Sequence, residues 1–142
     1  MAIKKISVIG LGTLGTQIAI QSAYYGYEVR AYDQDPQVFQ KTIQKIKGMM
    51  KFLGKNPTMG AEEWEKGAGK VKMAKDLPKA VKDGELVIEV VPEVLELKRK
   101  VWAEIDSLAS KGALLATNSS SIPVSRIESA TKRPEQCLNI HF

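Results

Sequence analysis

Cysteine and aromatic residues are scarce in this sequence, and each scarcity excludes a class of protein. The one cysteine among the 142 residues is Cys137, so the chain can form neither an internal disulfide nor a cysteine-rich zinc site. Because Cys137 lies in an apolar run, we expect a buried structural thiol. Aromatic residues make up 6% of the chain, too few for the stacking surfaces of single-strand nucleic-acid binders. Although the net charge is +5, we therefore predict no nucleic-acid partner, and no metal site.

Long hydrophobic runs are also missing. No stretch approaches the roughly 20 apolar residues that a membrane-spanning helix needs, and Met1 is followed by a short strand-like run rather than by a signal peptide. We therefore expect a cytoplasmic location and no membrane partner. Hydrophobic residues make up 44% and charged residues 26% of the chain, which is typical of a globular domain. The length suits one domain, which we place over residues 1–142.

Strand-like and helix-like segments alternate along the chain. Apolar and β-branched runs predict strands at residues 3–9, 28–32, 71–74, 86–91, 114–117 and 137–142. Apolar residues at three- and four-residue steps predict helices at 13–25, 36–53 and 94–109, with shorter ones at 61–66 and 122–130. The glycine-rich run at 67–70 predicts a loop. This alternation predicts a Rossmann-type α/β fold, a doubly wound and mostly parallel sheet with a helical arm after the second strand.

A glycine-rich turn joins the first predicted strand to the first predicted helix. It reads Gly10-Leu11-Gly12-Thr13-Leu14-Gly15, which is the G-x-G-x-x-G pattern of dinucleotide-binding folds in its required position. Gly10 would permit the tight turn, Gly12 would let a pyrophosphate approach the backbone, and Gly15 would let the helix pack against the strand. The phosphates would lie at the positive end of the helix dipole. We predict that these six residues bind a cofactor.

An acidic residue follows the second predicted strand. Asp33 lies 18 residues after Gly15 (33 − 15 = 18), close to the spacing of about 20 expected for the carboxylate that binds the adenosine ribose. Its charge would repel a 2′-phosphate, and the neighbouring Gln34 is not basic, so we predict NAD rather than NADP. FAD-binding proteins share the glycine pattern, and a plain glycine turn with a surface aspartate is the structural alternative.

Three later motifs resemble one family of dehydrogenases. Residues 87–93 read VIEVVPE and lead into LELKRK at 95–100, residues 116–123 read ATNSSSIP, and the chain closes on NIHF at 139–142. The order of these motifs is similar to that in the 3-hydroxyacyl-CoA dehydrogenase family, and the resemblance extends over essentially the whole chain. The resemblance implies the amino-terminal NAD-binding domain of an oxidoreductase that converts (S)-3-hydroxyacyl-CoA to 3-ketoacyl-CoA in fatty-acid β-oxidation.

The resemblance also implies roles for single residues. Glu93 and Lys98 match residues that contact the nicotinamide half of NAD. Asn118 and Ser120 match polar residues at the cofactor, and Ser120 also matches the serine that binds the substrate hydroxyl. His141 matches the catalytic histidine of a His-Phe motif. Imidazole is suited to accept the hydroxyl proton near neutral pH while hydride leaves for the nicotinamide.

Each of these roles has a structural alternative that the sequence leaves open. His141 could be a strand histidine bonded to the backbone, and residues 118–121 could be a polar turn. Glu93 and Lys98 could be surface charges around a helix start. The place of residues 118–121 after a buried strand favours a site, because open parallel sheets bind ligands beyond the carboxyl ends of their strands.

The long predicted helix and the segment after it carry a basic ridge. Lys47, Lys51 and Lys55 stand four residues apart, with Lys41 and Lys45 on a neighbouring row. In the family that the chain resembles, a helical arm at this place contacts coenzyme A. The ridge therefore predicts an acyl-CoA substrate, with Lys55 as a candidate substrate-binding residue. A solvated helix face is the alternative.

The resemblance further implies parts beyond residue 142. These are a glutamate that orients the histidine and a helical second domain that closes over the substrate and forms a homodimer. We expect the chain to end before that domain, and as an isolated fragment to be a nucleotide-binding module with little or no turnover. The turn reads Asn-Ser-Ser-Ser where Asn-Thr-Ser-Ser is usual, and Pro92 and Val94 around Glu93 also depart from the common pattern. The acyl-chain preference therefore stays open, and a related branch that oxidises sugar acids such as gulonate is an alternative.

Overall fold

The computed structural model describes residues 2–53 and 59–142, and a parallel sheet runs through the middle of them. The strand order is β3-β2-β1-β4-β5-β6, and every neighbouring pair is parallel. The strands are β1 (Lys5–Ile9), β2 (Glu28–Tyr32), β3 (Lys72–Met73), β4 (Leu86–Glu89), β5 (Leu114–Thr117) and β6 (Cys137–Asn139). This is the strand order of the doubly wound dinucleotide-binding fold, which confirms the predicted fold class.

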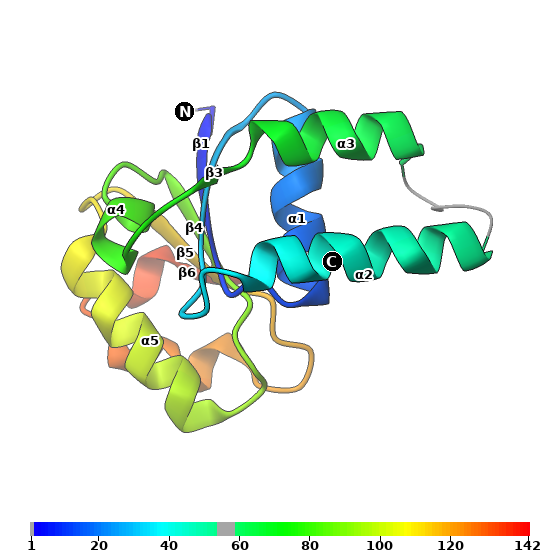
Figure 1. Cartoon of the computed structure of the whole chain (residues 1–142). Helices are drawn as coiled ribbons and strands as arrows, with labels where there is room; N and C mark the ends of the chain where they lie inside the picture. The colour runs from blue at the N-terminus through cyan, green and yellow to red at the C-terminus, as the bar shows by residue number, and fades with distance from the viewer. Residues whose placement is uncertain (1, 54–58) are drawn as a thin grey trace.

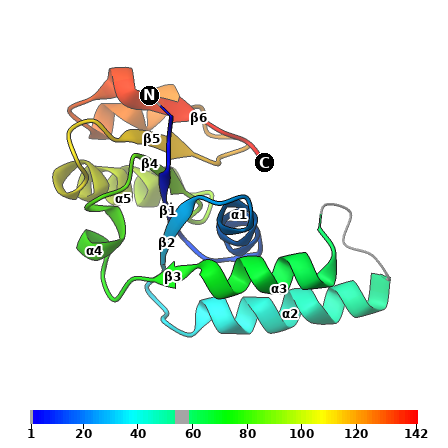
Figure 2. The same ribbon diagram turned by 90° about the horizontal axis from the view of Figure 1, so that it is seen from above.

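Helices cover both faces of the sheet (Figures 1 and 2). One face carries α1 (Thr13–Tyr24), α2 (Val38–Leu53) and α3 (Ala61–Lys70), and the other carries α4 (Leu77–Val81) and α5 (Leu95–Leu108). Each face has its own hydrophobic cluster. Successive residues of β4 serve both, since Val87 packs in the cluster with α5 and Ile88 in the cluster with α1. Burial on both faces explains the near-continuous apolar run of this strand.

The predicted arm after the second strand is a pair of helices, α2 and α3, that lie side by side (Figures 1 and 2). The expectation of a loop at residues 67–70 is wrong, because α3 continues to Lys70. A Cβ on Gly67 would lie 2.5 Å from the carbonyl oxygen of Ile20, so this glycine permits close packing of α3 on α1 rather than a turn. Lys47 Nζ lies 2.8 Å from Glu65 Oε1 and ties α2 to α3.

Two predicted helices begin or divide differently in the structure. The long helix starts at Val38 rather than at Pro36, because Asp35 forms a turn in which its carboxylate accepts the N–H of Gln37 at 2.9 Å. Residues 122–130 form two short 3₁₀ turns, at Val124–Arg126 and Glu128–Ala130, instead of one helix.

The short helix α4 was not expected from the sequence. Its start is capped by Asp76, whose carboxylate accepts the N–H of Lys79 at 2.8 Å. With Pro78 in the first turn, this is a standard helix start, and the signal could have been read. Five residues are too few for a visible hydrophobic repeat, which is why the periodicity missed it.

Three strands end earlier than predicted. β3 ends at Met73 rather than at residue 74, and the other two differences shape the carboxyl edge of the sheet. β4 ends at Glu89 rather than at residue 91, and β6 ends at Asn139 rather than at residue 142. Val90 and Val91 therefore leave the sheet and line a cavity. His141 and Phe142 follow their strand instead of belonging to it, and both are exposed.

Cys137 is half-buried rather than buried, at the start of β6. Its thiol lies 3.3 Å from the carbonyl oxygen of Arg133, to which it donates. Burial raises the pKa of the thiol, which suits a structural role better than a nucleophilic one. Across the part of the chain that the structure describes, no helix has the length and apolar character needed to cross a membrane.

Candidate functional site

The glycine-rich turn between β1 and α1 is held by contacts that only glycine allows. Gly10 has a φ of +95°, and a Cβ there would lie 2.7 Å from the carbonyl oxygen of Val90. A Cβ on Gly15 would lie 1.9 Å from the carbonyl oxygen of Gly10. By contrast, a Cβ on Gly12 would meet no atom within 4 Å. Gly10 and Gly15 therefore shape the turn, whereas Gly12 leaves open space in front of the helix start.

The start of α1 is suited to bind an anion. Gly12 is its N-cap and provides no side-chain cap, and the first turn carries no acidic residue. The first N–H groups of a helix have no partner within the helix, and they lie at the positive end of its dipole. A pyrophosphate fits this arrangement.

Asp33 connects the end of β2 to the glycine-rich turn. Its Oδ2 accepts the N–H of Leu11 at 2.8 Å, and its Oδ1 accepts the N–H of Asp35 at 3.0 Å. A carboxylate has about four acceptor positions, so both oxygens keep capacity for ribose hydroxyls. The predicted pairing of glycine turn and aspartate is thus present in the fold.

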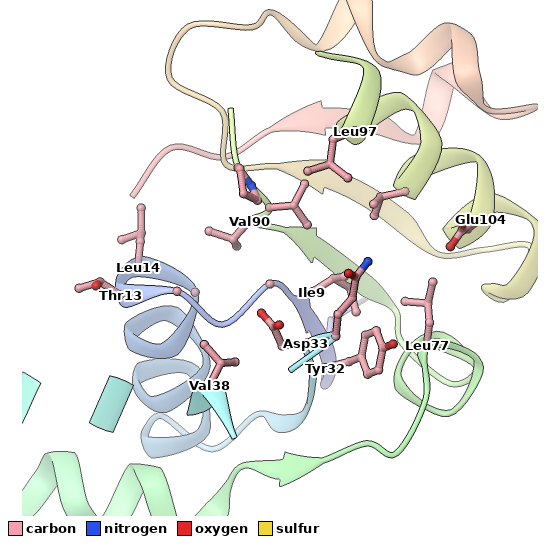
Figure 3. Close-up of a pocket in the computed structure, with 17 residues that line it drawn as sticks. Ile9, Thr13, Leu14, Tyr32, Asp33, Val38, Leu77, Val90, Leu97 and Glu104 are labelled. Atoms are coloured by element: carbon pink, nitrogen blue, oxygen red, sulfur yellow. The ribbon is translucent and has the colours of Figure 1, made fainter. Parts of the chain in front are cut away.

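A cavity of about 640 Å³ opens along this turn and runs between the end of β2 and α5 (Figure 3). Figure 3 shows Thr13 and Leu14 at one end, Leu77 and Glu104 at the other, and Asp33 between them. Its lining is mainly apolar and contains two carboxylates, Asp33 and Glu104, but no lysine or arginine. The size is that of a small-molecule site. An apolar slot next to a carboxylate with spare acceptor positions and a helix start suited to anions fits the adenosine and pyrophosphate of NAD.

The turn at residues 118–121 lies beside the His141 segment at the carboxyl edge of the sheet. β5 and β6 are paired with Thr117 opposite Asn139, and the N–H of Ile140 donates to the carbonyl of Thr117 at 3.0 Å. Asn118 Oδ1 accepts the N–H of Phe142 at 3.0 Å. Asn139 Nδ2 donates to the carbonyl of Ser119 at 2.9 Å. Since Ser120 and His141 are both exposed on these two neighbouring segments, the fold brings the two predicted catalytic residues to one edge.

A buried ion pair lies beneath this edge. Glu89 and Lys98 each have 1% of the side chain exposed, and Lys98 Nζ lies 2.8 Å from Glu89 Oε1. Lys98 also donates to the carbonyl of Val91 at 3.1 Å. Lys98 is therefore not the surface charge that the structural alternative described.

Glu93 joins the ion pair to the turn at residues 118–121. Its Oε1 accepts the hydroxyls of Ser119 and Ser121, the latter at 2.8 Å, together with the Ser121 N–H at 3.0 Å. Its Oε2 lies 3.4 Å from Lys98 Nζ. Burial raises the pKa of Glu93, but the hydrogen bonds from Ser119 and Ser121 and the charge of Lys98 outweigh it and lower the pKa to about 2. Glu93 is thus a carboxylate at any physiological pH.

Several residues of this network were not singled out from the sequence, namely Glu89, Thr117, Ser119, Ser121 and Asn139. Glu89 carried a readable signal, because a carboxylate within an apolar strand needs a buried partner. Lys98 carried the matching signal, since it stands on the buried side of α5 with Val101, Trp102 and Ile105. No such signal marked the serine contacts, because an ordinary polar turn has the same sequence pattern as a turn held by a carboxylate.

The basic ridge is only partly free on α2. Lys41 lies 3.3 Å from Asp35, and Lys47 pairs with Glu65. Lys55 lies outside the residues that the structure describes. In the described residues, no group of three or more histidine, cysteine, aspartate or glutamate side chains gathers as a metal site would require.

The strand order, glycine-rich turn, Asp33 and cavity together define a dinucleotide-binding domain of the dehydrogenase type. Residues 5–142 match the family described as "3-hydroxyacyl-CoA dehydrogenase, NAD binding domain". The chain belongs to this family, and its cofactor is NAD.

The relatives of the chain are oxidoreductases of more than one kind. It is 31% identical to the mitochondrial hydroxyacyl-coenzyme A dehydrogenase of Mus musculus, over 99% of this chain and 46% of the relative. It is also 31% identical to the 5-formyl-3-hydroxy-2-methylpyridine 4-carboxylate 5-dehydrogenase of Mesorhizobium japonicum, over 99% of this chain and 44% of the relative. A solved diketoreductase structure is 35% identical with a TM-score of 0.87, over 100% of this chain and 50% of that one. The chain thus spans half or less of the length of these relatives.

Proposed function

We propose that the chain is the cofactor-binding part of an NAD-dependent dehydrogenase that oxidises the 3-hydroxyl of (S)-3-hydroxyacyl-CoA to a ketone in fatty-acid metabolism. The observation that carries the proposal is the hydrogen-bonded meeting of the turn at 118–121 with residues 139–142, at the edge of the sheet where the cavity also opens. A substrate there would lie against the cofactor, as ligands of open parallel sheets do.

His141 and Ser120 would perform the substrate chemistry. Ser120 would hold the hydroxyl by a hydrogen bond, and His141 would take its proton as the O–H bond breaks. Bound NAD supplies the acceptor for the hydride that leaves the same carbon. The products are then a ketone, a protonated imidazole and reduced cofactor, so atoms and charge balance.

The remaining predicted residues would hold the cofactor. The glycine-rich turn and Asp33 would bind the pyrophosphate and the adenosine ribose, and the two carboxylates of the cavity would disfavour a 2′-phosphate. Glu93, Lys98 and Asn118 would define the nicotinamide side. Among these, the Oε2 of Glu93 is the atom with capacity to accept a ribose hydroxyl, because its Oε1 already accepts the serine turn.

An acyl-CoA substrate is supported by the family and by the basic character of α2. Lys45 and Lys51 are exposed on this helix and would suit the phosphates of coenzyme A, as Lys55 would. Relatives named 3-hydroxybutyryl-CoA dehydrogenase, such as the one from Bradyrhizobium diazoefficiens at 32% identity, point the same way. The parent protein would form a homodimer through its further domain.

A second candidate is a dehydrogenase of a hydroxy acid or aldehyde without coenzyme A, the class to which a gulonate-type enzyme belongs. It is favoured by one specific observation, the 31% identity to the pyridine-carboxylate dehydrogenase. A third is a nucleotide-binding module without turnover in the isolated chain.

Cofactor titration of the chain tests the proposal first. NADH should bind clearly more tightly than NADPH, followed by cofactor fluorescence, and tighter binding of NADPH would contradict the role of Asp33. Acetoacetyl-CoA-dependent oxidation of NADH, compared with a gulonate-derived or pyridine aldehyde substrate, then separates the candidates. Robust turnover by the 142-residue chain would exclude the module.

A further inference from the structure

Glu89 and Lys98 are a pair of buried charges that the fold itself does not require. Each has 1% of its side chain exposed. Buried ion pairs often contribute nothing net to stability, and apolar side chains of similar volume commonly serve as well. The pair lies in the hydrophobic layer that also holds Trp102 and Ile105, where apolar residues would pack without any desolvation cost. Its presence there calls for a role other than packing.

Four donors fix the Glu89 carboxylate. Oε1 accepts the N–H of Val91 at 2.7 Å and Lys98 Nζ at 2.8 Å. Oε2 accepts the hydroxyl of Thr117 at 2.9 Å and the indole N–H of Trp102 at 3.2 Å. These donors come from β5, from α5 and from the segment after β4, so the carboxylate is bonded on every side and has one orientation.

Glu89 in turn fixes the ammonium of Lys98. An ammonium has three N–H donors. One is directed to Glu89 and one to the carbonyl of Val91 at 3.1 Å. The remaining direction faces Glu93, whose Oε2 lies 3.4 Å away. The buried lysine therefore presents its charge to Glu93 from a fixed position.

Glu93 connects the fixed ammonium of Lys98 to the turn that carries Ser120. Its Oε1 accepts the backbone N–H of Ser121 at 3.0 Å. The N–H of Ile122 is shared between this oxygen at 3.3 Å and the Ser119 hydroxyl oxygen at 2.9 Å. Oε1 also accepts the hydroxyls on both sides of Ser120, those of Ser119 and Ser121. Ser120 is thus flanked by residues held on one carboxylate oxygen, while its own side chain stays exposed.

We propose that Glu89 is a positioning residue which, through Lys98 and Glu93, holds the turn bearing Ser120 in place against the nicotinamide side of the cofactor site. The same carboxylate, Glu93, then sets the position of the nicotinamide half of the cofactor and that of Ser120, which would bind the substrate. This inference rests on the proposed function, since it uses the roles of Glu93 and Ser120 given there.

Ligand binding by the Glu89→Gln chain tests the cofactor side. NADH and ADP are the two probes, because ADP has the adenosine and pyrophosphate but lacks the nicotinamide ribose. The affinity for NADH should fall about tenfold, the worth of a misplaced hydrogen bond to a charged group, while the affinity for ADP stays within about twofold. An equal fall for both ligands, or no fall for either, would overturn the proposal.

Hydrogen exchange at the turn tests the substrate side without any ligand. In Glu89→Gln, the amide protons of Ser121 and Ile122 should exchange about tenfold faster than in the wild type, because their acceptors, Glu93 Oε1 and the Ser119 hydroxyl bonded to it, are no longer fixed. Ile105→Val is the matched control, since Ile105 is buried on α5 but belongs to no hydrogen bond of the network. The Ile105→Val variant should lower the free energy of unfolding with little change in the exchange rates of the Ser121 and Ile122 amides.

A double variant guards against loss of folding in the single one. Glu89→Gln with Lys98→Met removes both charges, so no unpaired ammonium stays buried, and faster exchange at Ser121 and Ile122 is again expected. Wild-type exchange rates at the turn in both variants would show that the pair is only structural. If the wild-type chain binds neither NADH nor ADP, the proposed function fails, and the exchange rates still decide whether Glu89 fixes the turn.

Discussion

The two ends of the candidate site differ in whether the backbone or the side chains form them. At the glycine-rich turn the backbone makes the site: Gly10 and Gly15 allow close contacts, and Gly12 leaves space for a ligand. At the edge of β4, β5 and β6 the side chains make it, through a continuous series of bonds from Glu89 to Lys98, Glu93 and the serine turn. The first end consists of the six consecutive residues 10–15 together with Asp33. The second joins residues from three strands and a helix.

The difference predicts how each end responds to mutation. A backbone site fails when an added side chain meets fixed atoms, so its sensitivity is steric and local. A site of paired charges fails when one partner is removed, because the other is left buried without compensation. At the second end, removing one charged partner should therefore cost much more stability than removing both. At the first end, each substitution should have its own local effect.

The largest effect is expected from Lys98→Met alone. It leaves the Glu89 carboxylate buried without its cation, and we expect the free energy of unfolding to fall by about 3 kcal/mol. Glu89→Gln with Lys98→Met should recover most of this loss, to within about 1 kcal/mol of the wild type. Urea unfolding at pH 7 measures both. A double variant as unstable as the single one would mean that the pair is not coupled.

The next effect is steric and falls on the glycine-rich turn. Gly15→Ala places a methyl group 1.9 Å from the carbonyl oxygen of Gly10, and we expect a loss of about 2–3 kcal/mol. Gly12→Ala meets no atom within 4 Å, so it should cost about 1 kcal/mol or less in stability yet weaken NADH binding. Gly112→Ala, also free of contacts but outside the site, is the control for both measurements. Equal destabilisation by all three would refute this reading of the turn.

Asp33→Asn should change cofactor preference more than stability. The amide oxygen can still accept the N–H of Leu11, which Asp33 accepts at 2.8 Å, so the turn is retained. We expect NADH affinity to fall about tenfold because a charged acceptor is lost from the ribose. NADPH should be less affected, since the charge that opposes its 2′-phosphate is gone. Parallel titrations with the two cofactors measure the ratio, and an unchanged ratio would count against Asp33 as the determinant.

The smallest effect is a pH dependence at Glu93. Its pKa is lowered from 4.5 to about 2, so the folded state binds this proton less readily than the unfolded state does. The stabilisation is therefore complete above the unfolded pKa of 4.5 and is lost as the pH falls from there toward 2. Because 37% of the side chain is exposed, solvent screening leaves a contribution on the order of 1 kcal/mol. The stability difference between the wild type and Glu93→Gln should shrink from pH 7 to pH 3 in urea unfolding, and a constant difference would contradict it.

The sequence alone was sufficient for the fold class, and it predicted the glycine turn and the aspartate that the fold places in contact. Strong signals lay close together in the chain: a buried strand, the six-residue glycine turn, an amphipathic helix and Asp33 at the expected spacing. Local glycine signals were less dependable elsewhere. Gly67 reads as part of a loop, yet it lies inside α3, where a Cβ would meet the Ile20 carbonyl oxygen at 2.5 Å. Whether a glycine marks a turn or a close helix contact depends on a neighbour distant in sequence.

By its own pattern, the sequence determined the strand and helix alternation, the glycine turn and the acid that follows β2, because each depends on residues near one another along the chain. Only the tertiary structure decided which charges are buried and paired. Glu89 and Lys98 are nine residues apart and on different elements, and Glu93 meets serines 26 and 28 residues away. Parallel pairing of β4 with β5 brings these segments to one edge, and the low polarity of the packed interior then makes their pairing obligatory.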